Sequence, residues 1–147
     1  MNEMYRNHEG YFDPTAGKAV EHLSRPEKIP YRPIVYICSR YAGDTIKNAD
    51  AALRYCRFAV SRGCVPIAPH LFYAYLGILD DKSSIDRKIG LQFGIILENH
   101  CKEVWVFGDA PYSDGMTREY NHAVHRGIRI RTFTTDCVET GGADGSI

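Results

Sequence analysis

Apolar and polar positions along the chain form two kinds of periodic segment. Three short runs, PIVYICS, CVPIAPH and EVWVFG, are largely apolar and rich in β-branched or aromatic residues, as buried strands are. A fourth run, IRIRTF, alternates apolar and charged residues, as an edge strand would. Between these runs, apolar residues recur at the spacing of a helix with one buried face. The pattern predicts strands at 33–39, 64–70, 103–108 and 128–133, and helices at 45–63, 83–100 and 116–127.

The segments follow one another in the order β-α-β-α-β-α-β, which is the repeat of a parallel sheet with helical crossovers. We expect a small α/β domain of the flavodoxin-like kind at residues 31–135, with three layers and a mostly parallel sheet of four to five strands. Residues 1–30 show no clear period and hold three prolines, so we expect a flexible arm there. We expect a second flexible segment, the tail at 136–147. The aromatic and acidic stretch 71–83 stays ambiguous.

Charge and composition exclude several classes of protein. The 147 residues carry 18 basic and 18 acidic side chains, so the formal net charge is zero and there is no electrostatic support for binding a nucleic-acid polymer. No apolar run approaches the roughly 20 residues that span a bilayer, and the polar N-terminus predicts no signal peptide. The five cysteines form no CxxC pair and favour reduced thiols. We therefore expect a cytoplasmic protein with no membrane or nucleic-acid partner.

The end of the first strand is the first candidate binding region, because ligands of open α/β sheets bind beyond the carboxyl ends of the strands. Its sequence, SRYAGD, is neither a GxGxxG nor a GxxxxGK[ST] phosphate loop, so NAD and ATP are not expected as ligands. The candidate binding residues here are Ser39, Tyr41, Gly43, Asp44 and Asn48. An ordinary turn followed by a helix cap explains this stretch equally well.

The end of the second strand offers His70 and, further along, a group of carboxylates. The ring of His70 is placed to face the predicted crevice, but no HxxxH or HxH pair accompanies it, so we expect no metal site. Asp80, Asp81 and Asp86 follow in the sequence. They either supply an acid to the site or only cap and solubilise the next helix.

The end of the third strand carries Ser113, Asp114, Gly115 and Met116 directly before the helix that holds Glu119. Free N–H groups at a helix start attract anions, so a phosphate or a polar sugar would fit there. Glu119 also has the spacing of a capping-box acid for a helix whose N-cap is near Gly115 or Met116. Neither of those residues has the hydroxyl that such a box needs. Capping therefore explains Glu119 incompletely, which favours a role in the site.

As a set, the motifs YICSxYxGD, PIAPHL, EVWVFG and SxGMxxE resemble those of the nucleoside 2-deoxyribosyltransferase superfamily, in its little-characterised bacterial and phage branch. The resemblance covers residues 33–133. It implies a small Rossmann-like domain that cleaves the N-glycosidic bond of deoxynucleosides or their 5′-monophosphates. It also implies that Glu119 is the nucleophile and forms a glycosyl-enzyme intermediate.

The same resemblance implies roles for the other candidates. Ser113, Gly115 and Met116 would contact phosphate or sugar, and the loop at 39–44 would surround base and sugar, with Tyr41 against a ring. An aspartate near the base would donate a proton, and the candidates for it are Asp80, Asp81 and Asp86. The resemblance implies no cofactor, and it implies a homodimer or higher homo-oligomer in which a neighbouring subunit completes the pocket.

Three functions stay open at this point. The first is glycosyl chemistry, which is hydrolysis with water as acceptor and transfer with a second base as acceptor. The second is a non-catalytic module that binds or senses a nucleotide-derived ligand, since one fold hosts many functions. The third is a structural protein that uses its ten tyrosines as an interface.

Overall fold

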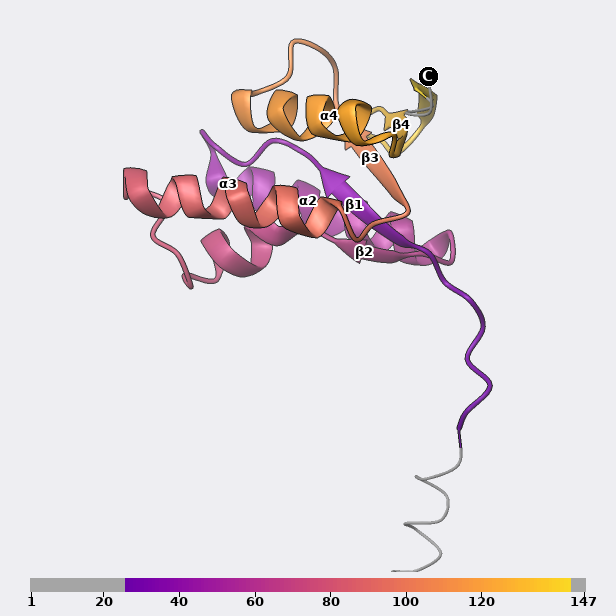
Figure 1. Cartoon of the computed structure of the whole chain (residues 1–147). Helices are drawn as coiled ribbons and strands as arrows, with labels where there is room; N and C mark the ends of the chain where they lie inside the picture. The colour runs from indigo at the N-terminus through magenta and orange to yellow at the C-terminus, as the bar shows by residue number, and fades with distance from the viewer. Residues whose placement is uncertain (1–25, 144–147) are drawn as a thin grey trace, which may run out of the picture. The chain divides into compact units, whose positions relative to one another are not determined.

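The computed structural model describes residues 26–143, in which helical segments connect the first four of five strands (Figure 1). The elements are β1 (Ile34–Cys38), α2 (Thr45–Ser61), β2 (Val65–Ile67), the π-helical turn η2 (Leu71–Tyr75), α3 (Ser84–Glu98), β3 (Glu103–Phe107), α4 (Asp114–Arg126), β4 (Arg129–Phe133) and β5 (Glu139–Ala143). Each predicted strand and helix is present, and the ambiguous stretch 71–83 contains η2. The arm predicted for residues 1–30 falls mostly on residues before 26, outside the described part. Within residues 26–143, no helix has the length and apolar content that a membrane crossing requires.

The sheet is parallel over four strands and antiparallel at one edge. Its order is β2-β1-β3-β4-β5, with β1 paired in parallel to both β2 and β3, and β3 paired in parallel to β4. The chain passes from β1 to β2 on one side and later returns to β3 on the other, so the strand order reverses between β1 and β3. Such a reversal opens a crevice beyond the carboxyl ends of these strands. The predicted α/β, flavodoxin-like arrangement with a mostly parallel sheet is therefore confirmed.

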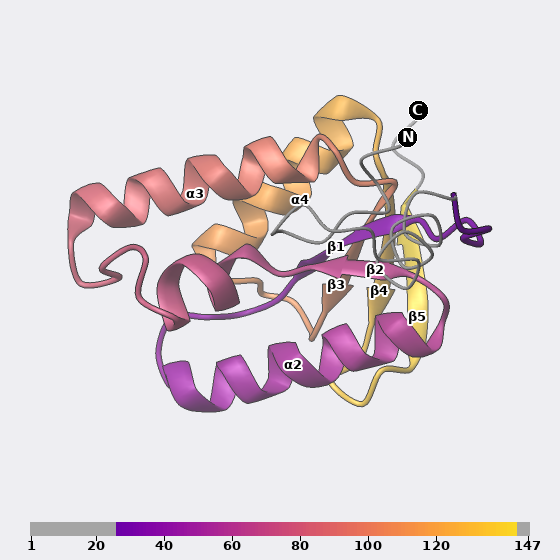
Figure 2. The same ribbon diagram turned by 90° about the horizontal axis from the view of Figure 1, so that it is seen from below.

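Different helices cover the two faces of the sheet, which gives three layers (Figure 2). Side chains alternate along β1, as the pleat of a strand requires. Val35 and Ile37 pack with residues of α2 in one buried apolar cluster, whereas Tyr36 and Cys38 belong to the cluster that contains Met116 of α4. The pleat therefore aims the phenol of Tyr36 toward the layer formed by α3 and α4.

The start of α4 corrects one prediction from the sequence. The helix begins at Asp114, and its N-cap is Ser113, whose Oγ accepts the N–H of Met116 at 3.4 Å. An N-cap near Gly115 or Met116 is therefore wrong, because the serine hydroxyl captures a free N–H group earlier in the chain. Glu119 lies in the second turn, beyond the position of a capping-box acid. Capping does not explain this carboxylate.

The last two strands correct two further expectations. The run IRIRTF forms β4, which is internal because β5 pairs with it in antiparallel fashion. Its charged side chains are compensated across the neighbouring strands, where Arg131 lies 3.6 Å from Glu103 of β3 and forms an ion pair with Glu139 of β5. Within the flexible tail expected at 136–147, residues Glu139–Ala143 form a strand, and these cross-strand partners are the physical reason. Residues 144–147 lie outside the described part.

Candidate active site

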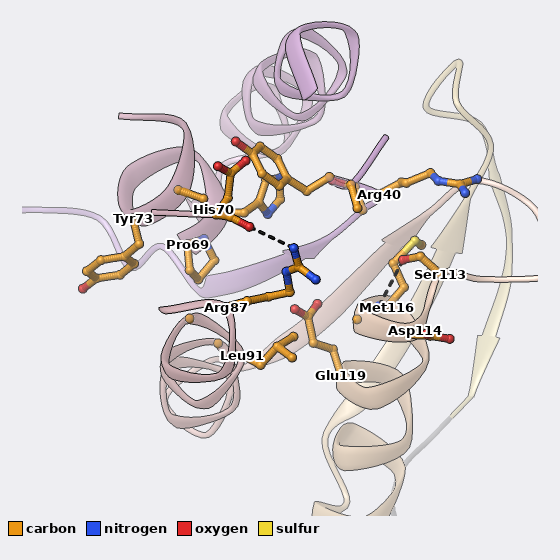
Figure 3. A pocket seen from close by; sticks show the side chains of 18 of the residues that line it. Arg40, Pro69, His70, Tyr73, Arg87, Leu91, Ser113, Asp114, Met116 and Glu119 are labelled. Carbon is orange, nitrogen blue, oxygen red and sulfur yellow. Dashed lines mark hydrogen bonds between the residues drawn. The ribbon is translucent and has the colours of Figure 1, made fainter. Parts of the chain in front are cut away.

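A pocket of about 870 Å³ opens where β1, β2 and β3 end (Figure 3). Its wall consists of the loop after β1, the segment from Pro69 into η2, the loop at 79–82, one face of α3, and the first two turns of α4. The volume is within the range of small-molecule sites. The pocket lies at the reversal of strand order, where ligands of this kind of sheet bind.

Glu119, in the second turn of α4, lines this pocket, and a tyrosine of the sheet is hydrogen-bonded to its carboxylate. The hydroxyl of Tyr36 donates to Glu119 Oε1 at 3.0 Å. Burial raises the pKa of Glu119 to about 7, while the nearby Cys38 thiol and Tyr36 hydroxyl lower it. Burial and the charge of Glu119 raise the pKa of Tyr36 well above its usual range, so the phenol keeps its proton and stays a donor. Glu119 is thus oriented and close to ionisation at neutral pH.

A glycine lets α3 approach the pair formed by Tyr36 and Glu119. A Cβ at Gly94 would lie 2.7 Å from the hydroxyl oxygen of Tyr36 and 3.5 Å from Glu119 Oε1. Real Cβ atoms essentially never come within 3.0 Å of another heavy atom. The helix therefore packs against the hydrogen bond itself at this position.

The binding residues predicted after β1 fall into two groups, those that line the pocket and those that do not. Ser39, Tyr41 and Gly43 line the pocket, and the hydroxyl of Ser39 is buried without a hydrogen-bond partner among the described residues. Asp44 and Asn48 do not line it. Asp44 caps α2, and the amide of Asn48 donates to the carbonyl oxygens of residues 41 and 42 at 3.0 and 3.1 Å. These two residues fix the shape of the loop instead.

His70 lines the pocket at the end of β2, as predicted. Its ring lies against that of Tyr41, with 5.3 Å between centroids. Its Nε2 is buried and has no partner in residues 26–143. Burial lowers the pKa of His70 to about 4, so the ring is neutral at physiological pH. A neutral imidazole nitrogen facing a pocket can accept or donate one hydrogen bond to a ligand.

The three aspartates named from the sequence differ in their surroundings. Asp81 and Asp86 line the pocket, whereas Asp80 does not. Asp86 Oδ2 accepts the backbone N–H of Asp80 at 2.8 Å, so part of its accepting capacity is already used. Burial raises the pKa of Tyr41, and the charge of Asp81, which lines the same pocket, raises it further.

The first turn of α4 contributes Ser113, Asp114, Gly115 and Met116 to the pocket wall, as predicted. Met116 is buried beneath the wall, and the Ser113 hydroxyl is occupied as the helix cap. Asp114 is exposed and points away from Glu119 in Figure 3. A Cβ at Gly115 would lie 3.7 Å from Leu91 Cδ2, so α3 approaches this turn closely.

The family model described as "Domain of unknown function (DUF7768)" matches residues 33–133, which is more than half of the chain. The chain belongs to this family. The match runs from the start of β1 to the end of β4, so the pocket lies inside the DUF7768 domain. No curated protein matches the sequence.

The DUF7768 domain shares its fold with an enzyme of solved structure. That enzyme is a 2-deoxyribosyltransferase from the psychrotolerant bacterium Bacillus psychrosaccharolyticus. The two superpose with a TM-score of 0.54 at 15% sequence identity, over 76% of this chain and 87% of the other. A likeness at this identity establishes the Rossmann-like fold that the motifs implied, and the activity has to be inferred from the pocket of the DUF7768 domain itself.

The sequence pattern did not predict that basic side chains line the pocket of the DUF7768 domain. Four of them line it: Arg40, Lys82, Arg87 and Arg118. The guanidinium of Arg87 faces the Glu119 carboxylate in Figure 3 and donates to the carbonyl oxygen of Asp81 at 3.1 Å. A signal for Arg87 was present, because Arg87, Leu91 and Gly94 recur at helical spacing and share one face of α3. Across residues 26–143, no group of three or more His, Cys, Asp or Glu side chains is arranged to hold a metal ion.

Proposed function

We propose that the DUF7768 domain cleaves or transfers the N-glycosidic bond of a (deoxy)nucleoside or nucleoside 5′-monophosphate, with Glu119 as the nucleophile. The observation that carries this proposal is the oriented carboxylate of Glu119 in a pocket of suitable volume, hydrogen-bonded by Tyr36 and close to ionisation at neutral pH. The shared fold with a 2-deoxyribosyltransferase supports the same chemistry. The basic side chains of the wall suit a substrate that carries a phosphate.

In the first step, a carboxylate oxygen of Glu119 attacks the anomeric carbon as the bond from that carbon to the base nitrogen breaks. The positive charge that develops on the sugar is stabilised by the same carboxylate, as in retaining glycosidases. The product is a glycosyl ester of Glu119 and a free base. Attack by water then gives the sugar and a hydrolase, whereas attack by a second base gives a new nucleoside and a transferase.

The departing base needs a proton, and Asp81 is the stronger of the two candidates in the pocket. Asp86 already accepts a backbone N–H, whereas Asp81 lies near the ring of Tyr41, where a base would stack. A protonated Asp81 would deliver its proton to the leaving nitrogen as the bond breaks. In the second step, the same carboxylate would accept a proton from water or from the incoming base.

The pH dependence of the reaction rate follows from the protonation state that Glu119 must have in order to attack. Attack requires the carboxylate, and burial raises the pKa of Glu119 to about 7. The rate should therefore rise as the pH rises through about 7.

The test is to incubate the purified protein with deoxynucleosides and their 5′-monophosphates and to measure free base by chromatography. Glu119→Gln keeps the size of the side chain and removes the nucleophile, so we expect loss of base release by at least about 10³-fold, the scale seen when a nucleophile is removed. Asp50→Asn, an exposed substitution on α2, is the matched control and should leave the rate unchanged. Intact mass after acid quench should show one added sugar in the wild type only.

Two outcomes would count against the proposal. Base release by Glu119→Gln at the wild-type rate would exclude this residue as nucleophile. No release from any substrate, with a nucleotide still raising the melting temperature, would point to a binding module. Adding a second base separates hydrolase from transferase. The homodimer or higher homo-oligomer implied by the motifs stays a prediction, and light scattering of the same preparation would measure it.

A further inference from the structure

The last residue of α3 is a fully buried carboxyl group that the proposed reaction does not use. Glu98 is 0% exposed, and neither of its carboxyl oxygens has a hydrogen-bond partner within residues 26–143. Buried carboxylates are normally paired with a cation or several donors, because an isolated buried charge is costly. A Glu98 that carries its proton avoids most of that cost.

Glu98 lies on the face of α3 that approaches the nucleophile. It follows Gly94 by four residues, so both share one side of the helix, and a Cβ at Gly94 would meet both Tyr36 and Glu119. The two helices are also joined beyond this point, because a ring nitrogen of His122 lies 2.7 Å from the amide oxygen of the residue after Glu98. Since His122 follows Glu119 by three residues on α4, the two glutamates sit on facing sides of adjacent helices.

Among residues 26–143, the ionisable group that acts most on the pKa of Glu98 is another acid. Burial, followed by the charge of Glu119 from α4, raises the pKa of Glu98 to about 8. Glu98 in turn raises the pKa of Tyr36 and Cys38 from β1 and of Cys101 from the loop after α3. Two neighbouring carboxyl groups in a largely apolar region cannot readily ionise together, and the Arg87 guanidinium faces Glu119, which favours the charge on that member of the pair.

We propose that Glu98 is a positioning residue for Glu119, in that it holds the proton of the pair at neutral pH and so leaves the negative charge on the carboxyl group that lines the pocket. The proposal rests on the proposed role of Glu119 as nucleophile. A single proton on the pair can reside on Glu98 or on Glu119. Glu119 can attack as a nucleophile only when the proton is on Glu98. Glu98 is completely buried, whereas Glu119 lines the pocket and accepts a hydrogen bond from Tyr36. The proton is therefore more stable on Glu98 and the negative charge on Glu119.

The proposal can be tested without substrate. Carboxyl ¹³C signals of glutamate-labelled protein are followed against pH, and the two glutamates are assigned from Glu98→Gln and Glu119→Gln. We expect Glu119 to lose its proton before Glu98 as the pH rises. In Glu119→Gln the repelling charge is gone, so Glu98 should titrate lower than in the wild type by about one pH unit, the scale of coupling between neighbouring carboxyls. In Glu98→Gln, whose side chain mimics the protonated acid, Glu119 should titrate close to its wild-type pH.

The order of titration decides between the alternatives. Loss of the Glu98 proton before that of Glu119, or an unchanged Glu98 titration in Glu119→Gln, would overturn the proposal. Because these signals come from the ligand-free protein, they stand even where no substrate releases base, so a failure of the proposed reaction is told apart from a failure of this inference. Glu119→Gln leaves Glu98 in place, which keeps the test open if Glu98→Gln does not fold.

Activity supplies a second readout. Well below pH 8, residue 98 is neutral in both Glu98→Gln and the wild type, so the ratio of their kcat values should be constant there. Above that pH the wild type gains a second buried negative charge beside Glu119, so the ratio should change with pH. A ratio that is below one and does not change with pH would assign Glu98 a merely structural role and contradict the proposal.

Discussion

Replacing Gly94 by alanine probes the contact of α3 with the hydrogen bond between Tyr36 and Glu119. The added Cβ would lie 2.7 Å from the Tyr36 hydroxyl oxygen, so the phenol or the helix must move. Tyr36 is fixed by the sheet and only 1% exposed, which leaves little room for the phenol to yield. Overpacking of this kind costs about 1–3 kcal/mol, and alanine in a helix interior recovers about 1 kcal/mol relative to glycine.

Gly90, one turn earlier on α3, is the matched control. A Cβ there would lie 3.5 Å from Leu79 Cδ1, which is an ordinary van der Waals contact. Both alanine variants gain the same helix propensity, so the difference between them isolates the collision. We expect Gly94→Ala to have a lower free energy of unfolding than Gly90→Ala by about 1–3 kcal/mol.

The assay is urea unfolding followed by far-ultraviolet circular dichroism, together with the carboxyl ¹³C titration of Glu119. Displacement of the Tyr36 hydroxyl removes one of the groups that lower the pKa of Glu119, so its titration should move above about 7 in Gly94→Ala only. Equal stabilisation of the two variants, with Glu119 titrating as in the wild type, would refute the close approach of α3.

Two further predictions concern the pocket. Tyr36→Phe keeps the ring and removes the donor to Glu119, so the pKa of Glu119, and with it the acid limb of any base release, should shift upward; a titration at the wild-type pH would contradict the role of the phenol. His70 has a pKa lowered by burial from 6.5 to about 4, so between these values the unfolded chain binds a proton that the folded state does not. The wild type should therefore lose stability relative to His70→Phe as the pH falls from about 6.5 to about 4, by at most about 1.4 kcal/mol per pH unit. Urea unfolding across that range measures the difference, and a gap that stays constant with pH would count against a buried neutral ring.

The order of strands and helices was predictable because hydrophobic periodicity is a local property. PIVYICS and EVWVFG became β1 and β3, and the helical spacing between them became α2 and α3. The strand β5 was not predictable, because its residues ETGGA have low strand propensity. It forms through the ion pair of Glu139 with Arg131 and through Gly142, where any Cβ would collide with the backbone oxygen of Ile130.

By itself, the sequence determined the α/β repeat, the loops that follow the strands and the placing of Glu119 in the loop-helix motif after β3. Only the tertiary structure decided what surrounds Glu119. In α3 the apolar side chain of Ile96 is 55% exposed, whereas the buried residues of this helix are Gly94 and Glu98. Hydrophobic periodicity identifies the apolar positions of a helix, whereas the burial of a helix face depends on the elements that pack against it. Here β1 and α4 bring the phenol of Tyr36 and the carboxylate of Glu119 to that face. At this contact α3 has Gly94, which leaves room for them, and Glu98, whose pKa is raised by burial.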